Sequence, residues 1–166
     1  MTWIRRVSPA VLLLSTSCYS FSGGGGLPGH IRTAYVAPIN NETTRFGLSE
    51  ILTQELLDAA RERLGLRLAA EAEADAIIRA SIQRYSDDAV NFEAREGEGA
   101  DVFQRRVTIS ARVEIFDVSR GESIWTNGAL VGVGEYEPDS GTEDEGTEVA
   151  LENLVQKIVD GAQSQW

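Results

Sequence analysis

Apolar residues recur at helical spacing in two segments of the chain. In the first, every fourth position of residues 48–64 is apolar, and Gly65 follows as a typical helix C-terminal signal: Leu48, Leu52, Leu56, Ala60 and Leu64. In the second, Thr142 and Glu145 fit a capping box, and a new apolar stripe follows it: Leu151, Leu154, Val155, Ile158 and Ala162. We therefore predict two amphipathic helices, the second near the C-terminus.

Between these helices the apolar residues alternate with polar ones, as they do in half-buried strands. Residues 33–39 form a short apolar stretch that ends at Asn40-Asn41, residues 67–69 suggest a brief strand, and residues 76–85 alternate. Residues 87–100 are polar and rich in Glu and Gly, which predicts a loop or a loose extension of the strand before it.

The clearest alternation lies in residues 102–134. Apolar residues occupy the odd positions Phe103, Val107, Ile109, Ala111, Val113 and Ile115, and polar residues occupy the even positions between them. Residues 117–122 resemble a turn, and residues 124–133 return as a second strand. If Ile115 pairs with Trp125, the buried faces coincide, with Ala111 opposite Ala129, Ile109 opposite Val131 and Val107 opposite Val133. A bulge at Gly121 would shift this register.

The predicted order is β-α-β-β-β-α within one domain, residues 31–166. Two helices on one face of a small, four-stranded and mainly antiparallel sheet make an α+β fold with two layers. After removal of residues 1–17, the remaining 149 residues are enough for one core.

The N-terminus has the features of a secretory signal. Arg5 and Arg6 precede a short apolar run, and small residues precede Cys18, the only cysteine of the chain. The run is far shorter than the ~20 apolar residues of a membrane-spanning helix. We predict a signal peptide over residues 1–17 and lipidation of Cys18, although Ser15 stands where a lipobox usually has Leu. The alternative is an ordinary signal cut near Ser17 with an unmodified thiol.

Residues 18–30 are rich in glycine, which is typical of a flexible tether between a lipid and a folded domain. The net charge is −11, and cleavage of the signal leaves 13 basic against 26 acidic residues. Such an acidic domain is a poor ligand for nucleic acid. It is also poorly suited to electrostatic adhesion to anionic headgroups, so attachment to a membrane is expected to come from the lipid.

Catalytic chemistry finds little support in the residues. His30, the only histidine, stands in the tether with no acid nearby in the sequence, and no nucleophile motif surrounds any serine. The acidic stretch 137–148 lacks the order of a calcium loop, and Asp87-Asp88 resembles a turn at a strand end. We therefore expect no catalytic residue, no metal site and no cofactor.

Arginines on the predicted strands are the best candidates for ligand binding, because their forked guanidinium groups suit phosphate. They are Arg79, Arg84, Arg105, Arg106 and Arg112. The alternative interpretation is that they pair with this acidic protein's own carboxylates. Arg105, Arg106 and Arg112 are the predicted lipid-binding residues, and the first two, as neighbours, are expected to point to opposite faces of the sheet.

The order of several short segments resembles the LptE family of lipopolysaccharide-assembly lipoproteins. These segments are Cys18–Ser22 with the glycine run, Leu27–Thr33, the strand ending in Pro38, Asn41–Leu48, Ala74–Ala76 and Gly121–Trp125. The resemblance implies two helices on a four-stranded sheet and a lipid-anchored place on the periplasmic side of the outer membrane. It also implies that the protein assembles with and plugs an LptD-type β-barrel translocon, and that it contacts lipopolysaccharide.

Two other classes of function stay open at this point. One is a different envelope lipoprotein that acts as a secretion-system or barrel assembly factor. The other is a periplasmic enzyme or ligand-binding domain, against which the missing nucleophile and base argue.

Overall fold

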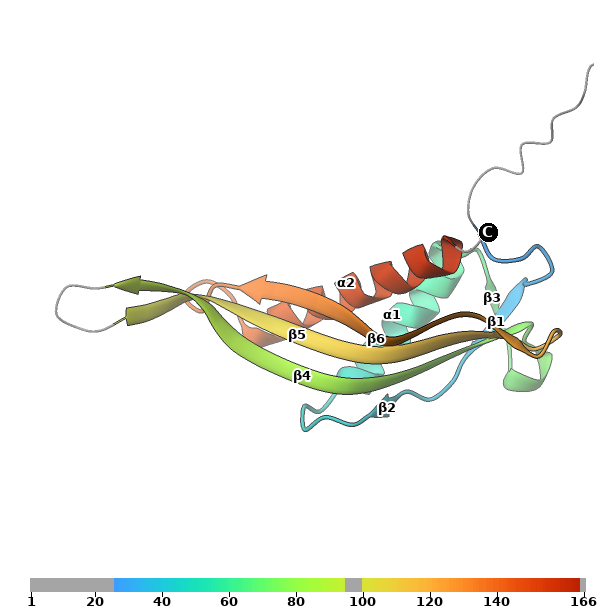
Figure 1. Ribbon diagram of the computed structural model, residues 1–166, viewed down its shortest axis with the longest axis horizontal. Coiled ribbons are helices and arrows are strands. Elements are labelled where there is room, and N and C mark those ends of the chain that lie inside the picture. The colour runs from blue at the N-terminus through green and yellow to red at the C-terminus, as the bar shows by residue number, and fades with distance from the viewer. Residues whose placement is uncertain (1–25, 95–99, 165–166) are drawn as a thin grey trace, which may run out of the picture.

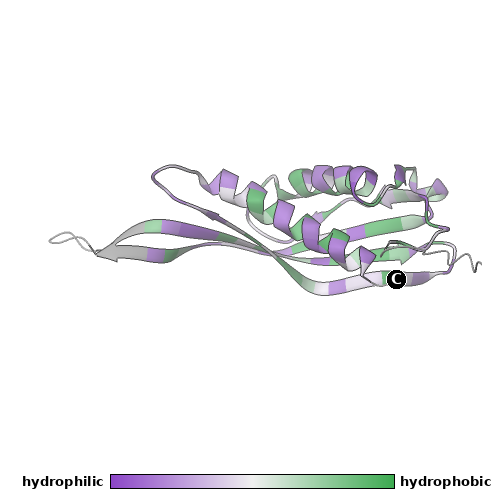
Figure 2. Ribbon diagram, turned by 90° about the horizontal axis from the view of Figure 1, so that it is seen from above, coloured by the Kyte–Doolittle hydropathy of each residue, from purple (hydrophilic) through white to green (hydrophobic). Residues whose placement is uncertain are grey.

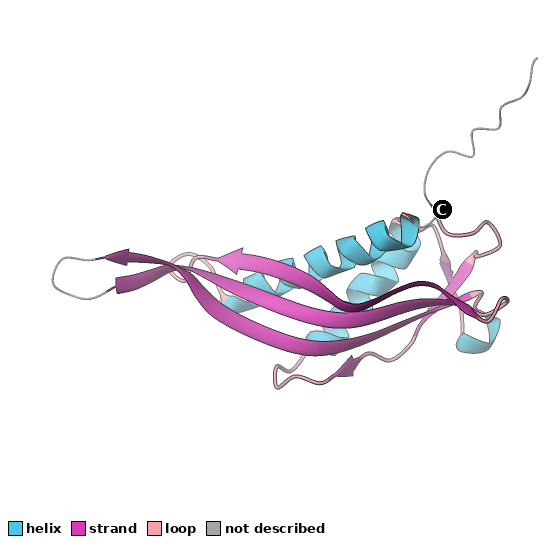
Figure 3. Ribbon diagram, in the orientation of Figure 1, coloured by secondary structure: helices cyan, strands magenta, loops and turns pink. Residues whose placement is uncertain are grey.

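Two helices lie on one face of a long, curved sheet in the computed structural model, which describes residues 26–94 and 100–164 (Figures 1 and 3). In chain order the elements are β1 (Thr33–Val36), β2 (Asn40–Asn41), α1 (Leu48–Glu62), β3 (Arg67–Leu68), a 3-10 turn (Glu71–Glu73), β4 (Ala76–Ala94), β5 (Ala100–Asp117), β6 (Glu122–Tyr136) and α2 (Glu143–Gln163). The predicted α+β class and single domain are confirmed.

The sheet has six strands rather than the four expected, in the order β3-β1-β4-β5-β6, with β2 paired to β4. Strands β4, β5 and β6 form an antiparallel meander, whereas the three short strands β1, β2 and β3 pair in parallel. The parallel pairing of β1 with β4 follows from α1, which carries the chain over one face between them. Asn40 and Asn41, expected to end a strand, instead form β2.

The core lies between the helices and the covered face of the sheet. Both predicted apolar stripes are buried except for Leu64, which lies beyond the end of α1 and is partly buried. Val107, Ile109, Ala111, Val113 and Ile115 of β5 are buried as well. Hydrophobic and hydrophilic segments alternate along both helices (Figure 2), as expected where only one side of each helix is buried. The helix signals are confirmed as well: Thr142 and Glu145 form the capping box of α2, and Gly65 has a positive φ of 66° just beyond α1.

The meander is longer than the alternation suggested. Residues 87–94, expected as a loop or a strand extension, continue β4, so that β4 and β5 form a hairpin that reaches beyond the helices (Figure 1). Phe103 was predicted to face the core but is 40% exposed. The prediction is wrong because Phe103 lies in the projecting part of the hairpin, where neither helix covers the sheet.

The predicted register of β5 with β6 is right at the turn and wrong further along. Ile115 pairs with Trp125, as expected, but a bulge between Ala111 and Val113 shifts the pairing by one residue. Ala111 therefore lies opposite Leu130, Ile109 opposite Gly132 and Val107 opposite Gly134. Asn127 stabilises the bulge, because its side-chain oxygen accepts the Ala129 N–H at 3.0 Å.

The shifted register turns two glycines toward α2. A Cβ atom on Gly132 would lie 2.1 Å from the Ala150 carbonyl oxygen, and one on Gly134 would lie 2.0 Å from that of Gly146. The backbone of α2 therefore rests directly on β6, which only glycine permits.

Candidate binding surface

The helices leave the other face of the sheet open. Because side chains alternate along a strand, the residues next to the buried ones share this uncovered face. It carries Arg79, Ser81, Arg84, Arg106, Thr108, Ser110, Arg112 and Glu114. Cross-strand pairing sets Ser81 opposite Arg112 and Arg84 opposite Ser110, so the middle of the face is polar and rich in arginine.

Two of these arginines are held by carboxylates on the same face. Arg79 donates to Glu114 at 3.0 Å, and its guanidinium lies 4.9 Å from the centre of the Phe116 ring. Hydrogen bonds from Ser123 and Arg79 lower the pKa of Glu114. Arg106 donates to Glu135 through Nε at 2.8 Å and Nη2 at 2.6 Å. The alternative interpretation, that strand arginines pair with the protein's own acids, is confirmed for these two.

Arg112 lines a small hollow in the uncovered face, with a volume of about 220 Å³. The other lining residues are Arg79, Ala80, Ser81 and Glu114. Arg79, Arg112 and Glu114 thus contribute to the lining of one shallow hollow.

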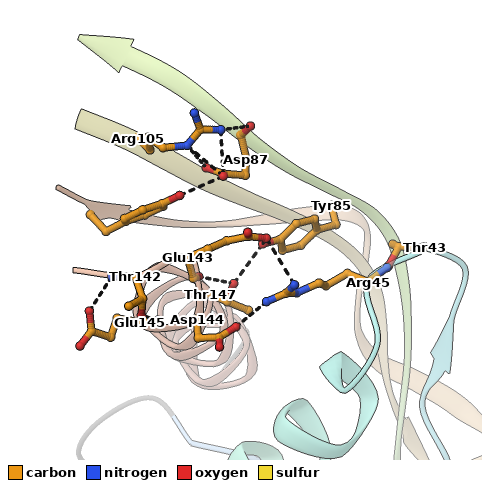
Figure 4. A network of polar contacts seen from close by, with 11 residues as sticks. Thr43, Arg45, Tyr85, Asp87, Arg105, Thr142, Glu143, Asp144, Glu145 and Thr147 are labelled. Carbon is orange, nitrogen blue, oxygen red and sulfur yellow. Dashed lines mark hydrogen bonds and ion pairs between the residues drawn. The ribbon is translucent and has the colours of Figure 1, made fainter. Parts of the chain in front are cut away.

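Arg105 points to the opposite, helix-covered side, as expected for the neighbour of Arg106. Its Nε lies 3.1 and 3.0 Å from the two carboxylate oxygens of Asp87, and its Nη2 donates to the Asp87 carbonyl oxygen at 3.0 Å (Figure 4). The Tyr136 hydroxyl donates to Asp87 at 3.0 Å. Burial and the hydrogen bond to Asp87 raise the pKa of Tyr136, and the same carboxylate raises that of Arg105. Asp87 therefore connects Arg105 of β5 to Tyr136 at the end of β6.

A second polar cluster fixes the start of α2 to the hairpin. The Tyr85 hydroxyl donates to Glu143 at 2.7 Å and lies 3.1 Å from the Thr147 hydroxyl, while Arg45 forms ion pairs with Glu143 and Asp144 (Figure 4). Burial, together with the Glu143 carboxylate, raises the pKa of Tyr85 to about 12. The alternating pattern did not reveal this cluster, because its partners are separated by 58 to 99 residues.

Asp87 and His30 correct two expectations. Asp87 is not part of a turn but lies within β4 and faces the covered side. His30 was expected to have no acid nearby, yet its Nε2 lies 2.6 Å from a carboxylate oxygen of Asp117, 87 residues away in sequence. Asp117 is 1% exposed. This contact holds the beginning of the domain against the end of β5.

Within residues 26–94 and 100–164, no group of three or more His, Cys, Asp or Glu residues is placed to hold a metal ion. No helix in this part of the chain is long and apolar enough to cross a membrane. Cys18, the predicted lipidation site, and residues 1–17, the predicted signal peptide, lie outside the described residues.

The arrangement defines a small α+β domain with one face of its sheet covered by helices and the other polar and open. The profile of the LptE lipopolysaccharide-assembly family matches residues 31–162, which is most of the chain, and the protein belongs to this family. No protein with a curated description matches the sequence.

Solved structures share the fold at low sequence identity. The hypothetical protein CT253 from Chlamydia trachomatis has a TM-score of 0.54 and 12% identity, covering 81% of this chain and 97% of its own. The PelC dodecamer from Paraburkholderia phytofirmans has a TM-score of 0.53 and 16% identity, covering 86% and 96%. An uncharacterized lipoprotein B from Nitrosomonas europaea has a TM-score of 0.53 and 13% identity, covering 84% and 85%.

Proposed function

We propose that this protein is an outer-membrane lipoprotein, anchored on the periplasmic side through Cys18, that assembles with an LptD-type β-barrel translocon and occupies its lumen. In this role it assists the insertion of lipopolysaccharide into the outer leaflet. Membership of the LptE lipopolysaccharide-assembly family supports the general role. The proposed position of the domain inside the barrel rests on its shape and polarity.

The observation that carries the proposal is the uncovered, polar face of the sheet. A folded sheet normally buries one face and exposes the other, but here the exposed face presents four arginines on a protein of net charge −11. The lumen of a large β-barrel is polar and filled with water. A polar sheet face suits contact with such a lumen, and its arginines can contact the phosphates of lipopolysaccharide.

A crosslinking scan in living cells tests the partner. Photoreactive residues at Arg79, Thr108, Arg112 and Thr126 are expected to capture an integral β-barrel protein. Further photoreactive residues show how far the contact extends. They are placed at Ala129 on the β6 edge, Glu71 in the 3-10 turn and Arg61 on α1. Capture of soluble periplasmic proteins alone, by a protein that is folded and lipidated, contradicts the plug and favours the alternative of a secretion-system or barrel assembly factor.

Lipidation is tested separately by mass spectrometry of the mature N-terminus from membranes. We expect a chain that begins at Cys18 and carries a diacylglyceryl group, with the Cys18→Ala variant released from the membrane fraction. A bare thiol at Cys18, or residues 1–17 still attached, contradicts the anchor without bearing on the fold.

A further inference from the structure

A groove runs between the outer surfaces of α1 and α2, which lie side by side on the sheet (Figures 1 and 2). Its volume is about 550 Å³, and it is lined by Ile51 and Glu55 of α1 and by Glu145, Glu148, Val149 and Glu152 of α2. Residues three, four or seven positions apart share one side of a helix, so each set forms a continuous stripe. The two stripes face each other across one groove on the outer side of the helix layer.

Apolar side chains are exposed in this groove and at the adjoining start of α1. Ile51 is 38% exposed and Val149 is 49% exposed. Phe46 directly precedes Gly47, the N-cap of α1, and is 93% exposed. An apolar residue in that position commonly packs on the fourth residue of the helix, here Ile51, but a side chain that is 93% exposed makes no such contact.

These three side chains are gathered rather than scattered. They make up three of the seven large apolar side chains that are exposed among the described residues, and all three lie in the first two turns of the helices or just before them. Single exposed apolar residues are ordinary on a protein surface, whereas a group of them around a groove indicates a surface that another molecule covers.

The charge of the groove indicates the chemistry of that molecule. Four of the six lining residues are glutamates and none is basic. Glu145 accepts the Thr142 N–H at 2.8 Å in the capping box, but Glu55, Glu148 and Glu152 form no ion pair among the described residues. The basic side chains of the helices and of the adjoining segments are engaged elsewhere: Arg45 with Glu143 and Asp144, Arg61 with Asp58, Arg63 with Gln156, and Lys157 with the Val131 carbonyl oxygen.

The carboxylates are also too dispersed to share one metal ion, since no group of three or more acidic, histidine or cysteine side chains in residues 26–94 and 100–164 is placed to hold one. An anionic membrane surface is excluded as well, because it would face four glutamates. The complementary ligand is one that carries several separate cationic groups beside apolar ones.

We propose that the α1–α2 groove docks a cationic amphipathic helix of a partner protein. Such a helix can lay an apolar stripe over Ile51 and Val149 while its lysines or arginines contact Glu55, Glu148 and Glu152. It would complete a layer of three helices by the packing of side-chain ridges into grooves. The α2 side of the groove covers about two helical turns, or roughly 11 Å, so a partner helix of three turns spans it. The inference goes beyond the proposed function, because the groove lies on the helix layer and not on the uncovered sheet face.

The test measures binding of a synthetic helix by the chain without residues 1–17, which keeps the whole core because every buried core residue lies between Ile31 and Ala162. The probe is a fluorescent, end-capped peptide of lysine, leucine and alanine, about 15 residues long so that it is helical, with its leucines in one stripe. A second peptide has the same composition with its leucines distributed around the helix. Fluorescence anisotropy in 0.15 M NaCl is expected to show binding about tenfold tighter for the striped peptide.

Two variants of the groove are each compared with a matched control. Glu148→Gln/Glu152→Gln is expected to weaken binding about tenfold, and Val149→Ser about fivefold. Glu71→Gln/Glu73→Gln removes the same charge from the exposed 3-10 turn, and Val118→Ser removes a valine that is 44% exposed elsewhere. Both controls are expected to bind within twofold of the wild type.

Thermal melts confirm that each variant is folded, as expected because Glu148, Glu152 and Val149 are all exposed. Equal binding of the two peptides, or wild-type binding by both groove variants, overturns the proposal. Equal weakening by Glu71→Gln/Glu73→Gln also overturns it, because binding would then follow the overall charge of the protein. Neither barrel nor lipopolysaccharide is present in the assay, so its outcome is independent of the tests of the proposed function.

Discussion

At the scale of single residues, the close packing of α2 on β6 depends on two glycines of β6, Gly132 and Gly134, which have no side chain. Replacing Gly134 with alanine places a methyl group 2.0 Å from the Gly146 carbonyl oxygen, which forces the helix away from the sheet. Overpacking of this kind costs roughly 1–3 kcal/mol. We expect Gly134→Ala to lower the free energy of unfolding in urea by at least that amount.

The control for this prediction lies six residues earlier on the same strand. A Cβ atom on Gly128 meets no atom within 4 Å, and Gly128 does not have a positive φ. Gly128→Ala is therefore expected to change the urea midpoint very little. If both variants unfold at the same urea concentration, the close approach of α2 to Gly134 does not contribute to stability.

Asp117 is a buried carboxylate whose titration is coupled to the stability of the fold. Burial alone raises the pKa of Asp117, but hydrogen bonds from Ser119, His30 and the Arg120 N–H outweigh it and lower the pKa to about 2. Because the folded-state pKa lies below the ordinary value of 3.8, the carboxylate stabilises the fold above about pH 4. This contribution is lost as the pH falls toward 2.

We therefore expect Asp117→Asn to lower the free energy of unfolding at pH 7 by roughly 1–3 kcal/mol, since it leaves buried donors poorly matched. Between pH 4 and pH 2 the wild-type protein is expected to lose stability more steeply than the variant. Thermal melts over this range measure both effects, and parallel pH profiles for the two proteins would contradict the role given to Asp117.

At the scale of elements, alternation located the strands and helices but not their full length or exact pairing. Ile109 and its odd-numbered neighbours on β5 are buried as predicted, because burial of one face imposes a period of two. The bulge near Asn127 left no comparable pattern, since it depends on one side-chain hydrogen bond. The distant partners Tyr85–Glu143 and His30–Asp117 were missed because only the folded chain brings them together.

Two substitutions at adjacent positions test which side chains of β5 point into the core. Ile109 is fully buried, and Ile109→Asp places an unpaired charge in the core, which is expected to prevent accumulation of folded protein. Ser110→Asp introduces the same charge on the uncovered face, where water solvates it, and is expected to leave the melting temperature within a few degrees of the wild type. Similar expression and melting of both variants would show that the assignment of faces is wrong.

Strand β6 is an edge of the sheet, and α2 shields part of it. The Lys157 ammonium donates to the Val131 carbonyl oxygen at 2.7 Å, and the Asn153 side chain accepts the Val133 N–H at 3.2 Å. The Val131 carbonyl and the Val133 N–H both lie on the sheet edge. Without these side-chain contacts they would be free to pair with another strand. We expect Asn153→Leu/Lys157→Met to self-associate at concentrations where the wild type is monodisperse in sedimentation velocity. Gln156→Leu adds apolar surface to α2 without uncovering these groups and is expected to stay monodisperse.

At the scale of the whole molecule, the helix layer and the uncovered face of the sheet differ in charge. The helix layer is strongly acidic, the uncovered sheet face carries Arg79, Arg84, Arg106 and Arg112, and Arg105 is used internally with Asp87. Composition showed only the net charge of −11 and predicted an acidic protein without distinction of faces. Of the three arginines predicted to contact lipid, the fold thus leaves Arg106 and Arg112 on the open face.

This division makes a specific prediction for lipopolysaccharide binding. Arg106→Glu and Arg112→Glu each reverse a charge on the uncovered face and are expected to weaken binding of purified lipopolysaccharide severalfold at 0.1 M salt, with a smaller difference at 0.5 M, because exposed charges are screened. Arg61→Glu makes the same change on the helix layer and is expected to bind like the wild type. Arg105→Glu is expected to act differently, by breaking the contact with Asp87 and lowering the melting temperature of the hairpin region. Binding that is unchanged in both open-face variants, or weakened equally by Arg61→Glu, would show that lipopolysaccharide does not bind the uncovered face through these arginines.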